Sequence, residues 1–169
     1  KVLQALNLKG AWASYGSVAI TLLFVVGCII ATPLINVIGR RSMVIHSFLW
    51  SGLALLGLGY FSSGSEVLVL ILFGAYAVFI GGAQVLQLVY PNELFPTEIR
   101  SAAVGMGASL SRIGAAVGTW LVPISLQGIG IGNTMFAAAA VTLLGLLVSL
   151  ALAPETRSLS LQEAASLNR

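Results

Sequence analysis

Five long apolar runs separated by short polar breaks are the feature that most constrains how this sequence can fold. The runs cover residues 15–36, 43–62, 67–89, 101–123 and 133–153. Each is about as long as the roughly 20 apolar residues that a helix needs to cross the hydrocarbon core of a bilayer. Only 8% of the 169 residues are charged, whereas a soluble domain has about 25%. We therefore predict an all-α membrane protein of about five transmembrane helices, with residues 15–153 forming the bundle.

The charged breaks predict how this bundle is oriented. Arg40 and Arg41 lie in the first break, and residues 91–100 form a second break with two prolines and three charges. Because Lys and Arg are concentrated in cytoplasmic loops, we expect these two breaks and the tail, residues 154–169, to face the cytoplasm. Residues 1–14 are then an extracytoplasmic connection. This topology predicts a multi-pass protein of the inner or plasma membrane with a cytoplasmic C-terminus.

Glycine is unusually frequent, with 19 residues, and has two expected roles. The glycines of residues 128–133 predict a flexible turn before the fifth run. Inside the fourth run, Gly114 and Gly118 form a small-xxx-small pair, and such residues let helices approach closely in lipid. We expect helix contact there; the alternative is that these glycines let the helix bend.

Three segments on the predicted cytoplasmic side carry a recognisable pattern. Residues 36–41 read N-x-x-G-R-R, residues 91–100 read P-N-E-L-F-P-T-E-I-R, and residues 154–157 read P-E-T-R. Together, in this order and spacing, they resemble the sugar-porter-like branch of the major facilitator superfamily. Asn36 stands where that family usually has Asp, and Ser158 stands where Gly is usual.

The resemblance implies that the five runs correspond to helices eight to twelve of a twelve-helix transporter. Residues 1–14 would then be the connection from helix seven. The expected partners are therefore the lipid bilayer, the N-terminal half of the transporter and a small-molecule substrate. An odd number of helices that starts outside the cell also suggests that upstream sequence is missing.

Charged residues near the predicted cytoplasmic surface suit a gate. Partly exposed ion pairs are worth only about 0–1 kcal/mol each, but a small network can tip an equilibrium between two states that differ by a few kcal/mol. The alternative is that the arginines determine topology and nothing more. The candidate gate residues are Arg40, Arg41, Glu93, Glu98, Arg100, Glu155 and Arg157.

Arg112 is the most informative residue of the apolar runs. It lies about eleven residues into the fourth run, which at about 1.5 Å per residue places it near the middle of the bilayer. A charge at this depth is costly and usually faces a cavity or a solute pathway. All five acidic residues lie at the ends of the runs or beyond them. The counter-charge is therefore an anionic substrate or, alternatively, a group on the N-terminal half.

Other polar side chains share the predicted pathway. Ser109 and Thr119 lie on the Arg112 face, with hydrogen bonding to their own helix as the alternative. Tyr76, Gln84 and Gln87 share one face of the third run; they either contact a polar solute or bond to other helices. The segment around Arg112 resembles the eleventh helix of organic anion and aromatic-acid carriers, which implies an anion-binding role for this arginine.

These observations predict a secondary active transporter of a small organic anion or related metabolite, which works by alternating access. Proton coupling is implied by the family resemblance alone. The alternatives are a sugar or polyol symporter and a truncated membrane fragment that does not transport. The sequence contains no GxGxxG followed by an acidic residue, no Walker loop and no cluster of metal ligands, so we expect no enzyme activity, no cofactor and no metal. The isolated Lys and Arg residues form no basic stripe, so we expect no nucleic-acid partner.

Overall fold

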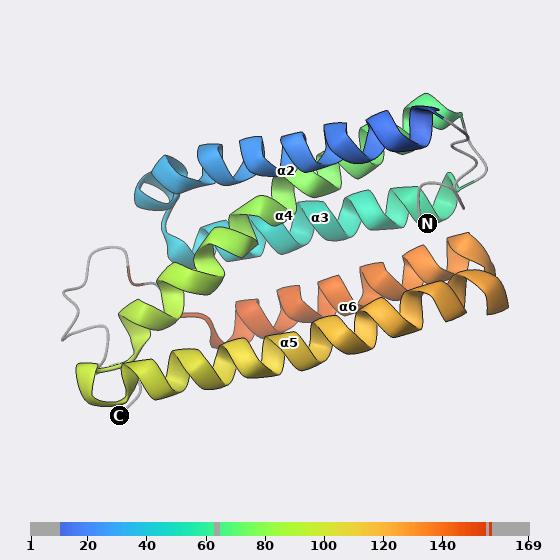
Figure 1. Cartoon of the computed structure of the whole chain (residues 1–169). Helices are drawn as coiled ribbons and strands as arrows, with labels where there is room; N and C mark the ends of the chain where they lie inside the picture. The colour runs from blue at the N-terminus through green and yellow to red at the C-terminus, as the bar shows by residue number, and fades with distance from the viewer. Residues whose placement is uncertain (1–10, 63–64, 155, 157–169) are drawn as a thin grey trace.

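The computed structural model describes residues 11–62, 65–154 and 156. In this part the chain forms five long helices that run back and forth (Figure 1). They are α2 (Ala11–Ile38), α3 (Arg40–Tyr60), α4 (Glu66–Leu94), α5 (Thr97–Gly128) and α6 (Gly130–Leu152). The predicted all-α architecture is confirmed.

Four of the helices are long and apolar enough to cross a membrane by length and composition: α2, α3, α4 and α6. The fifth, α5, is the longest at 32 residues but is less apolar, because glycines, serines and Arg112 interrupt its first two-thirds. In Figure 1 the α2–α3 connection, the α4–α5 connection and the end of α6 lie at the same end of the bundle. The charged segments therefore gather at one end, which we call the charged end.

The breaks between helices are shorter than predicted. Gly39 alone separates α2 from α3, with a φ of 99° that favours glycine, so Arg40 and Arg41 lie in the first turn of α3. Between α5 and α6 only Ile129 is not helical, and Gly130 has a φ of 79°. The turn predicted within residues 128–133 is present but shorter than expected, because one residue and one left-handed glycine reverse the chain.

Three further boundaries differ from the prediction. We expected a break from Pro91, but α4 continues to Leu94, and the chain turns at Phe95, whose backbone is extended before Pro96. A proline disfavours the helical conformation in the residue before it, so Pro96 ends α4 where Pro91 does not. Likewise α5 continues past Pro123 to Gly128. In the described chain α2 already includes residues 11–14, which are therefore helical rather than part of a connection.

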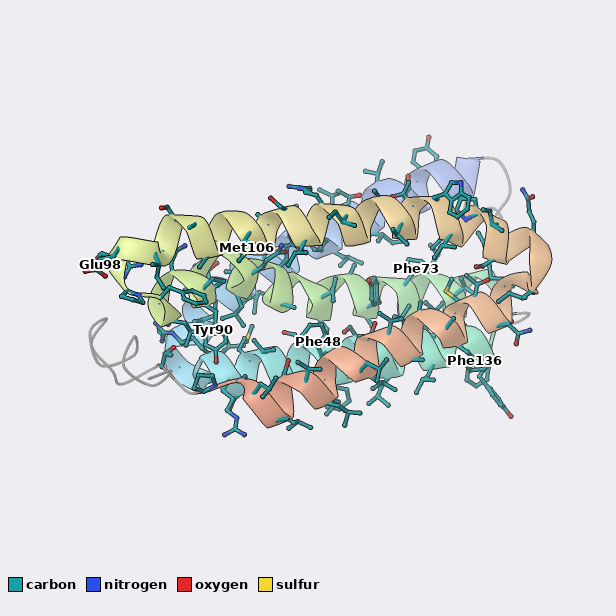
Figure 2. The ribbon with its side chains drawn as sticks, turned by 90° about the horizontal axis from the view of Figure 1, so that it is seen from below. Phe48, Phe73, Tyr90, Glu98, Met106 and Phe136 are labelled. Carbon is teal, nitrogen blue, oxygen red and sulfur yellow. The ribbon has the colours of Figure 1, made fainter. Side chains whose placement is uncertain are left out.

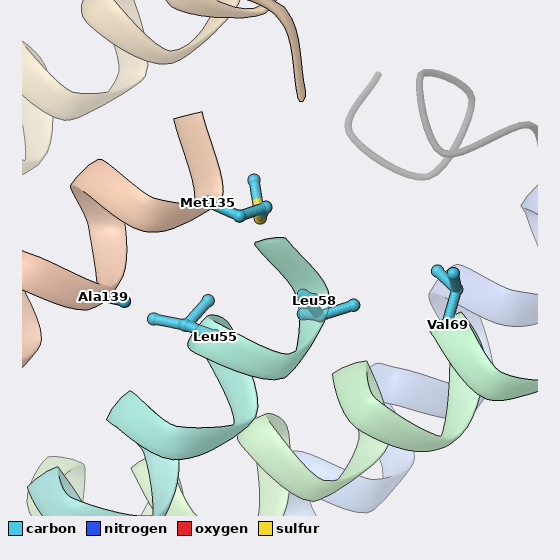
Figure 3. Close-up of a cluster of buried hydrophobic side chains, with 5 residues drawn as sticks. All are labelled: Leu55, Leu58, Val69, Met135 and Ala139. Carbon is cyan, nitrogen blue, oxygen red and sulfur yellow. The ribbon is translucent and has the colours of Figure 1, made fainter. Parts of the chain in front are cut away.

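Among the described residues, buried apolar side chains join α2, α3, α4 and α6, whereas α5 contributes none of them. One buried cluster joins α3, α4 and α6 (Figure 3), and a second joins α2, α3 and α4. The first consists of Leu55, Leu58, Val69, Met135 and Ala139. The second consists of Ala31, Ile35, Met43, Val44 and Leu86. No residue of α5 is buried within the described part of the chain.

The glycines show the same division. A methyl group at Gly27 of α2 would overlap the backbone of Val78 in α4, and one at Gly82 would overlap Ser47 of α3. At Gly114 and Gly118, by contrast, an added methyl group would meet no atom within 4 Å. The predicted close contact at the Gly114 and Gly118 pair was therefore wrong for the described chain. The close approaches are made by glycines of α2, α3 and α4.

Candidate functional site

The charged end is held by an ion pair between two of the predicted gate residues. The Arg40 side chain, at the start of α3, donates from Nη2 to Glu93 Oε1 over 2.9 Å. Its Nε lies 3.2 Å from Oε1 and 3.1 Å from Oε2 of the same carboxylate. Both side chains are mostly buried, with exposed fractions of 15% and 18%. This forked geometry is the stronger form of Arg–carboxylate pairing and fixes α3 against the last turn of α4.

The segment after α6 joins the same carboxylate. Thr156, which is buried, donates its hydroxyl to Glu93 Oε2 over 2.6 Å. The Tyr90 hydroxyl donates to the backbone carbonyl of Pro154. Glu93 thus connects the N-x-x-G-R-R segment, the P-N-E segment and the P-E-T segment. The three motifs that lie far apart in the sequence form one cluster, which we call the Glu93 cluster (Arg40, Tyr90, Glu93, Pro154 and Thr156).

Thr156 and Tyr90 are not among the predicted gate residues, because only charged side chains were expected to form the gate. A threonine beside a predicted carboxylate cluster, and a tyrosine directly before Pro91, were the signals available. The predicted gate residues Glu155 and Arg157 lie outside the described residues.

The remaining predicted gate residues lie at the charged end without joining the Glu93 carboxylate. Arg41 donates from Nη2 to the backbone carbonyl of Leu150, near the end of α6, over 3.0 Å. Arg100 donates from Nε to the carbonyl of Phe95 over 3.0 Å. Glu98 is exposed at the start of α5 (Figure 2) and forms no ion pair with the residues that the structure describes. These arginines therefore satisfy helix-end carbonyls.

A cavity of about 470 Å³ lies between α3, α4 and α5, beside the Glu93 cluster. Its lining is mainly apolar, and Figure 2 shows two of its aromatic side chains, Phe48 and Tyr90. The predicted substrate residues Gln84 and Gln87 line it, as do Ala103 and Gly107 of α5. No charged side chain is part of the lining. The two glutamine amides are therefore the main polar groups that this cavity offers to a solute.

Gln87 also connects the cavity to the middle of α5. Its amide Nε2 donates to Ser111 Oγ over 3.1 Å. The next residue, Arg112, is exposed and forms no hydrogen bond or ion pair with another described residue. Glu98 lies 14 residues earlier on the same helix, which corresponds to about 21 Å along its axis. The guanidinium is therefore without a counter-charge in the described part of the chain.

The other predicted substrate residues are placed differently. Tyr76 is half-buried beside the α3–α4–α6 core cluster and meets Phe73 edge to face at 6.1 Å between ring centres. It is not part of the cavity lining that contains the two glutamines. Ser109 donates to the carbonyl of Gly105 over 2.9 Å, and Thr119 donates to that of Ala115 over 2.8 Å. Both hydroxyls therefore bond to their own helix, which was the alternative to a role in the solute pathway.

Comparison with known proteins identifies related transporters. The family model described as "Sugar (and other) transporter" matches residues 1–167. The "Putative metabolite transport protein YaaU" of Escherichia coli is 48% identical over 158 residues, which are 94% of this chain and 36% of that protein. The "Inner membrane metabolite transport protein YgcS" of the same organism is 34% identical over 160 residues, 95% of this chain and 35% of that protein.

A plant protein is similar over a shorter stretch. The "Inorganic phosphate transporter 1-2" of Oryza sativa is 35% identical over 86 residues, 44% of this chain and 16% of that protein. The chain spans about a third of the length of the two bacterial relatives. Its family match covers nearly all of its residues, and its helices are those of a membrane protein. The chain therefore belongs to the sugar (and other) transporter family of the major facilitator superfamily.

Proposed function

We propose that the protein containing this chain is a secondary active transporter of a small organic anion, in which Arg112 binds the anionic group of the substrate. The supporting observation is an exposed guanidinium in the middle of a long helix, with no acidic partner among the described residues. An unpaired charge at membrane depth is costly unless it faces water or a counter-charge. An anionic substrate supplies that counter-charge.

The chemistry of arginine narrows the substrate class. A guanidinium has a planar fork of donors that matches a carboxylate or a phosphate, and it stays charged at all physiological pH values. Two of the relatives are named as metabolite transport proteins, and one is named as an inorganic phosphate transporter. The mainly apolar cavity next to Gln87 favours a carboxylate with a small organic body over phosphate.

The Glu93 cluster supports an alternating-access mechanism. It joins α3, α4 and the segment after α6 at one end of the bundle. We propose that this cluster holds one conformation at the cytoplasmic surface and loosens in the other. Proton coupling is part of the same proposal, and its carboxylate would lie outside the described helices, because Glu66, Glu93 and Glu98 all lie at or near helix ends.

The test is an uptake assay on the full-length protein with labelled organic acids, phosphate and sugars. For the transported carboxylate we expect Arg112→Ala to lower kcat/KM at least about 100-fold, because a charged hydrogen bond and its ion pair are lost. Arg112→Lys keeps the charge but loses the fork, so part of the activity remains. The control is Leu110→Ala, which removes an exposed apolar side chain two residues away and leaves uptake unchanged.

The alternatives give different results in the same assay. A sugar or polyol symporter fits the family description and the two cavity glutamines. In that case sugar uptake is present and insensitive to Arg112→Ala, which contradicts the anion proposal. If the protein is instead a truncated membrane fragment that does not transport, it takes up none of the tested solutes.

A further inference from the structure

The hydrogen bond between Gln87 and Ser111 joins the two helices that carry the candidate transport site. It is the one side-chain to side-chain hydrogen bond between α4 and α5 that the described residues show. Few other contacts hold α5 in the described chain. None of the described residues of α5 is buried, and Gly105, Gly107, Gly114 and Gly118 have open space around them.

Within the described chain, this sparse packing does little to fix the rotation of α5 about its own axis. Large apolar side chains that interlock with a neighbour normally fix such a rotation, and the lining that α5 gives to the cavity consists of small residues. These residues are Ala103, Val104, Gly107 and Ala108. A directional contact near the middle of the helix therefore has a large influence on where its other side chains point.

Ser111 directly precedes Arg112, and consecutive residues of an α-helix are about 100° apart around its axis. When Ser111 faces α4, the direction of Arg112 is set as well. We propose that Gln87 is a positioning residue for anion binding: its hydrogen bond to Ser111 holds α5 in the rotation that presents Arg112 to the substrate. This inference rests on the anion-binding role of Arg112 proposed above.

The experiment is a double-mutant cycle on the full-length protein, with KM and kcat of carboxylate uptake measured for Gln87→Leu, Ser111→Ala and the double variant. We expect each single variant to raise KM about threefold to tenfold, the range that the loss of one neutral hydrogen bond gives. The double variant raises KM no further than the larger single effect. The exchanged pair Gln87→Ser with Ser111→Gln restores part of the affinity.

Two further measurements separate positioning from other roles. The thermal unfolding midpoint and the kcat of each variant stay close to those of the wild type. This is expected because α5 still folds and only the direction of the Arg112 side chain changes. The control Gln127→Leu removes an exposed amide near the far end of α5 and leaves KM unchanged. The conservative Ser111→Ala keeps the test usable if Gln87→Leu does not fold.

Each opposite result has its own meaning. If Gln87→Leu raises KM and Ser111→Ala does not, Gln87 contacts the substrate itself and the positioning role is overturned. If both single variants keep the wild-type KM, or if their effects multiply in the double variant, it is overturned as well. Loss of carboxylate uptake in Arg112→Ala alongside those results leaves the transport proposal intact, whereas an insensitive Arg112→Ala overturns that proposal instead.

Discussion

Helices α4 and α5 are neighbours in sequence and similar in length, yet they differ in how closely they pack against the other helices. The α4 helix contributes to both buried clusters and touches the backbone of α2 through close contact at glycines. The α5 helix contributes no buried residue and carries glycines that meet nothing. In the described chain, α2, α3, α4 and α6 therefore form a packed scaffold, whereas α5 leaves both large apolar side chains, such as Trp120, and polar ones, such as Arg112, exposed. Glycines are frequent in both helices, but those of α4 allow close contact with neighbouring helices, whereas those of α5 contact no other helix in the described chain.

The largest expected effect comes from filling a glycine of the scaffold. At Gly27 a methyl group would overlap the Val78 backbone, which cannot move aside as a flexible side chain does. We expect Gly27→Ala to lower the free energy of unfolding by about 2–3 kcal/mol, as overpacking does. The matched variant Gly114→Ala, in α5, causes no loss. Thermal unfolding of the purified protein in detergent compares the two, and equal losses would show that the division between scaffold and α5 is wrong.

A smaller effect is expected in the Glu93 cluster. Glu93→Gln removes the negative charge that the mostly buried Arg40 guanidinium and the Thr156 hydroxyl both contact. We expect a loss of about 1–2 kcal/mol in the free energy of unfolding. The control is Glu98→Gln, which changes an exposed carboxylate that has no ion pair among the described residues. A Glu93→Gln variant as stable as Glu98→Gln would contradict the structural role of the cluster.

Thr156 gives a finer test of the same cluster. Thr156→Val keeps the shape of the side chain but loses the 2.6 Å hydrogen bond to Glu93. The expected cost is about 0.5–1.5 kcal/mol, the usual range for one hydrogen bond. In Thr21→Val the lost hydroxyl is exposed and bonded only to its own helix, at Ser17, so the change in unfolding midpoint is smaller. A reversed order of the two midpoints would mean that the segment after α6 does not hold the charged end.

Arg112→Ala is expected to change stability least. The side chain is exposed and has no described partner, and such surface changes stay within about 0.5 kcal/mol. Calorimetric unfolding of the full-length variant in the absence of substrate measures this. A large loss would instead indicate that Arg112 pairs with a carboxylate elsewhere in the full-length protein, which is the structural alternative to substrate binding.

Much of the scaffold was predictable from the sequence, because length and apolar content determine which segments can be membrane helices. The clustering of the charged end was also predictable, since alternating helices return three motif segments to one side. The exact breaks were not. Pro91 looked like a helix end, yet Pro96 ends α4. A proline weakens the interior of a helix, yet α4 continues through Pro91, so the presence of a proline does not by itself fix where a helix ends.

The candidate site was predictable only in part. The pairing of Arg40 with Glu93 followed from the expectation of opposite charges on neighbouring loops, but Thr156 and Tyr90 entered through contacts that a sequence does not specify. Tyr76 and Gln87 share one helix face, yet a difference of eleven residues along α4 places one at the core cluster and the other at the cavity. Helical periodicity predicts which residues share a face of a helix. It does not predict which neighbouring helix packs against that face at each position along the axis.

Water access at position 112 tests most directly whether Arg112 faces a solute route. The full-length protein is prepared with its native cysteines, including Cys28, replaced by serine, and then carries either Arg112→Cys or, as a control on the exposed face of α6, Leu144→Cys. We expect a charged, water-soluble thiol reagent to label the Arg112→Cys protein rapidly and the Leu144→Cys protein slowly, and we expect the transported anion to slow labelling at position 112. Equally slow labelling at both positions would place the Arg112 side chain against lipid and contradict its role in binding the substrate.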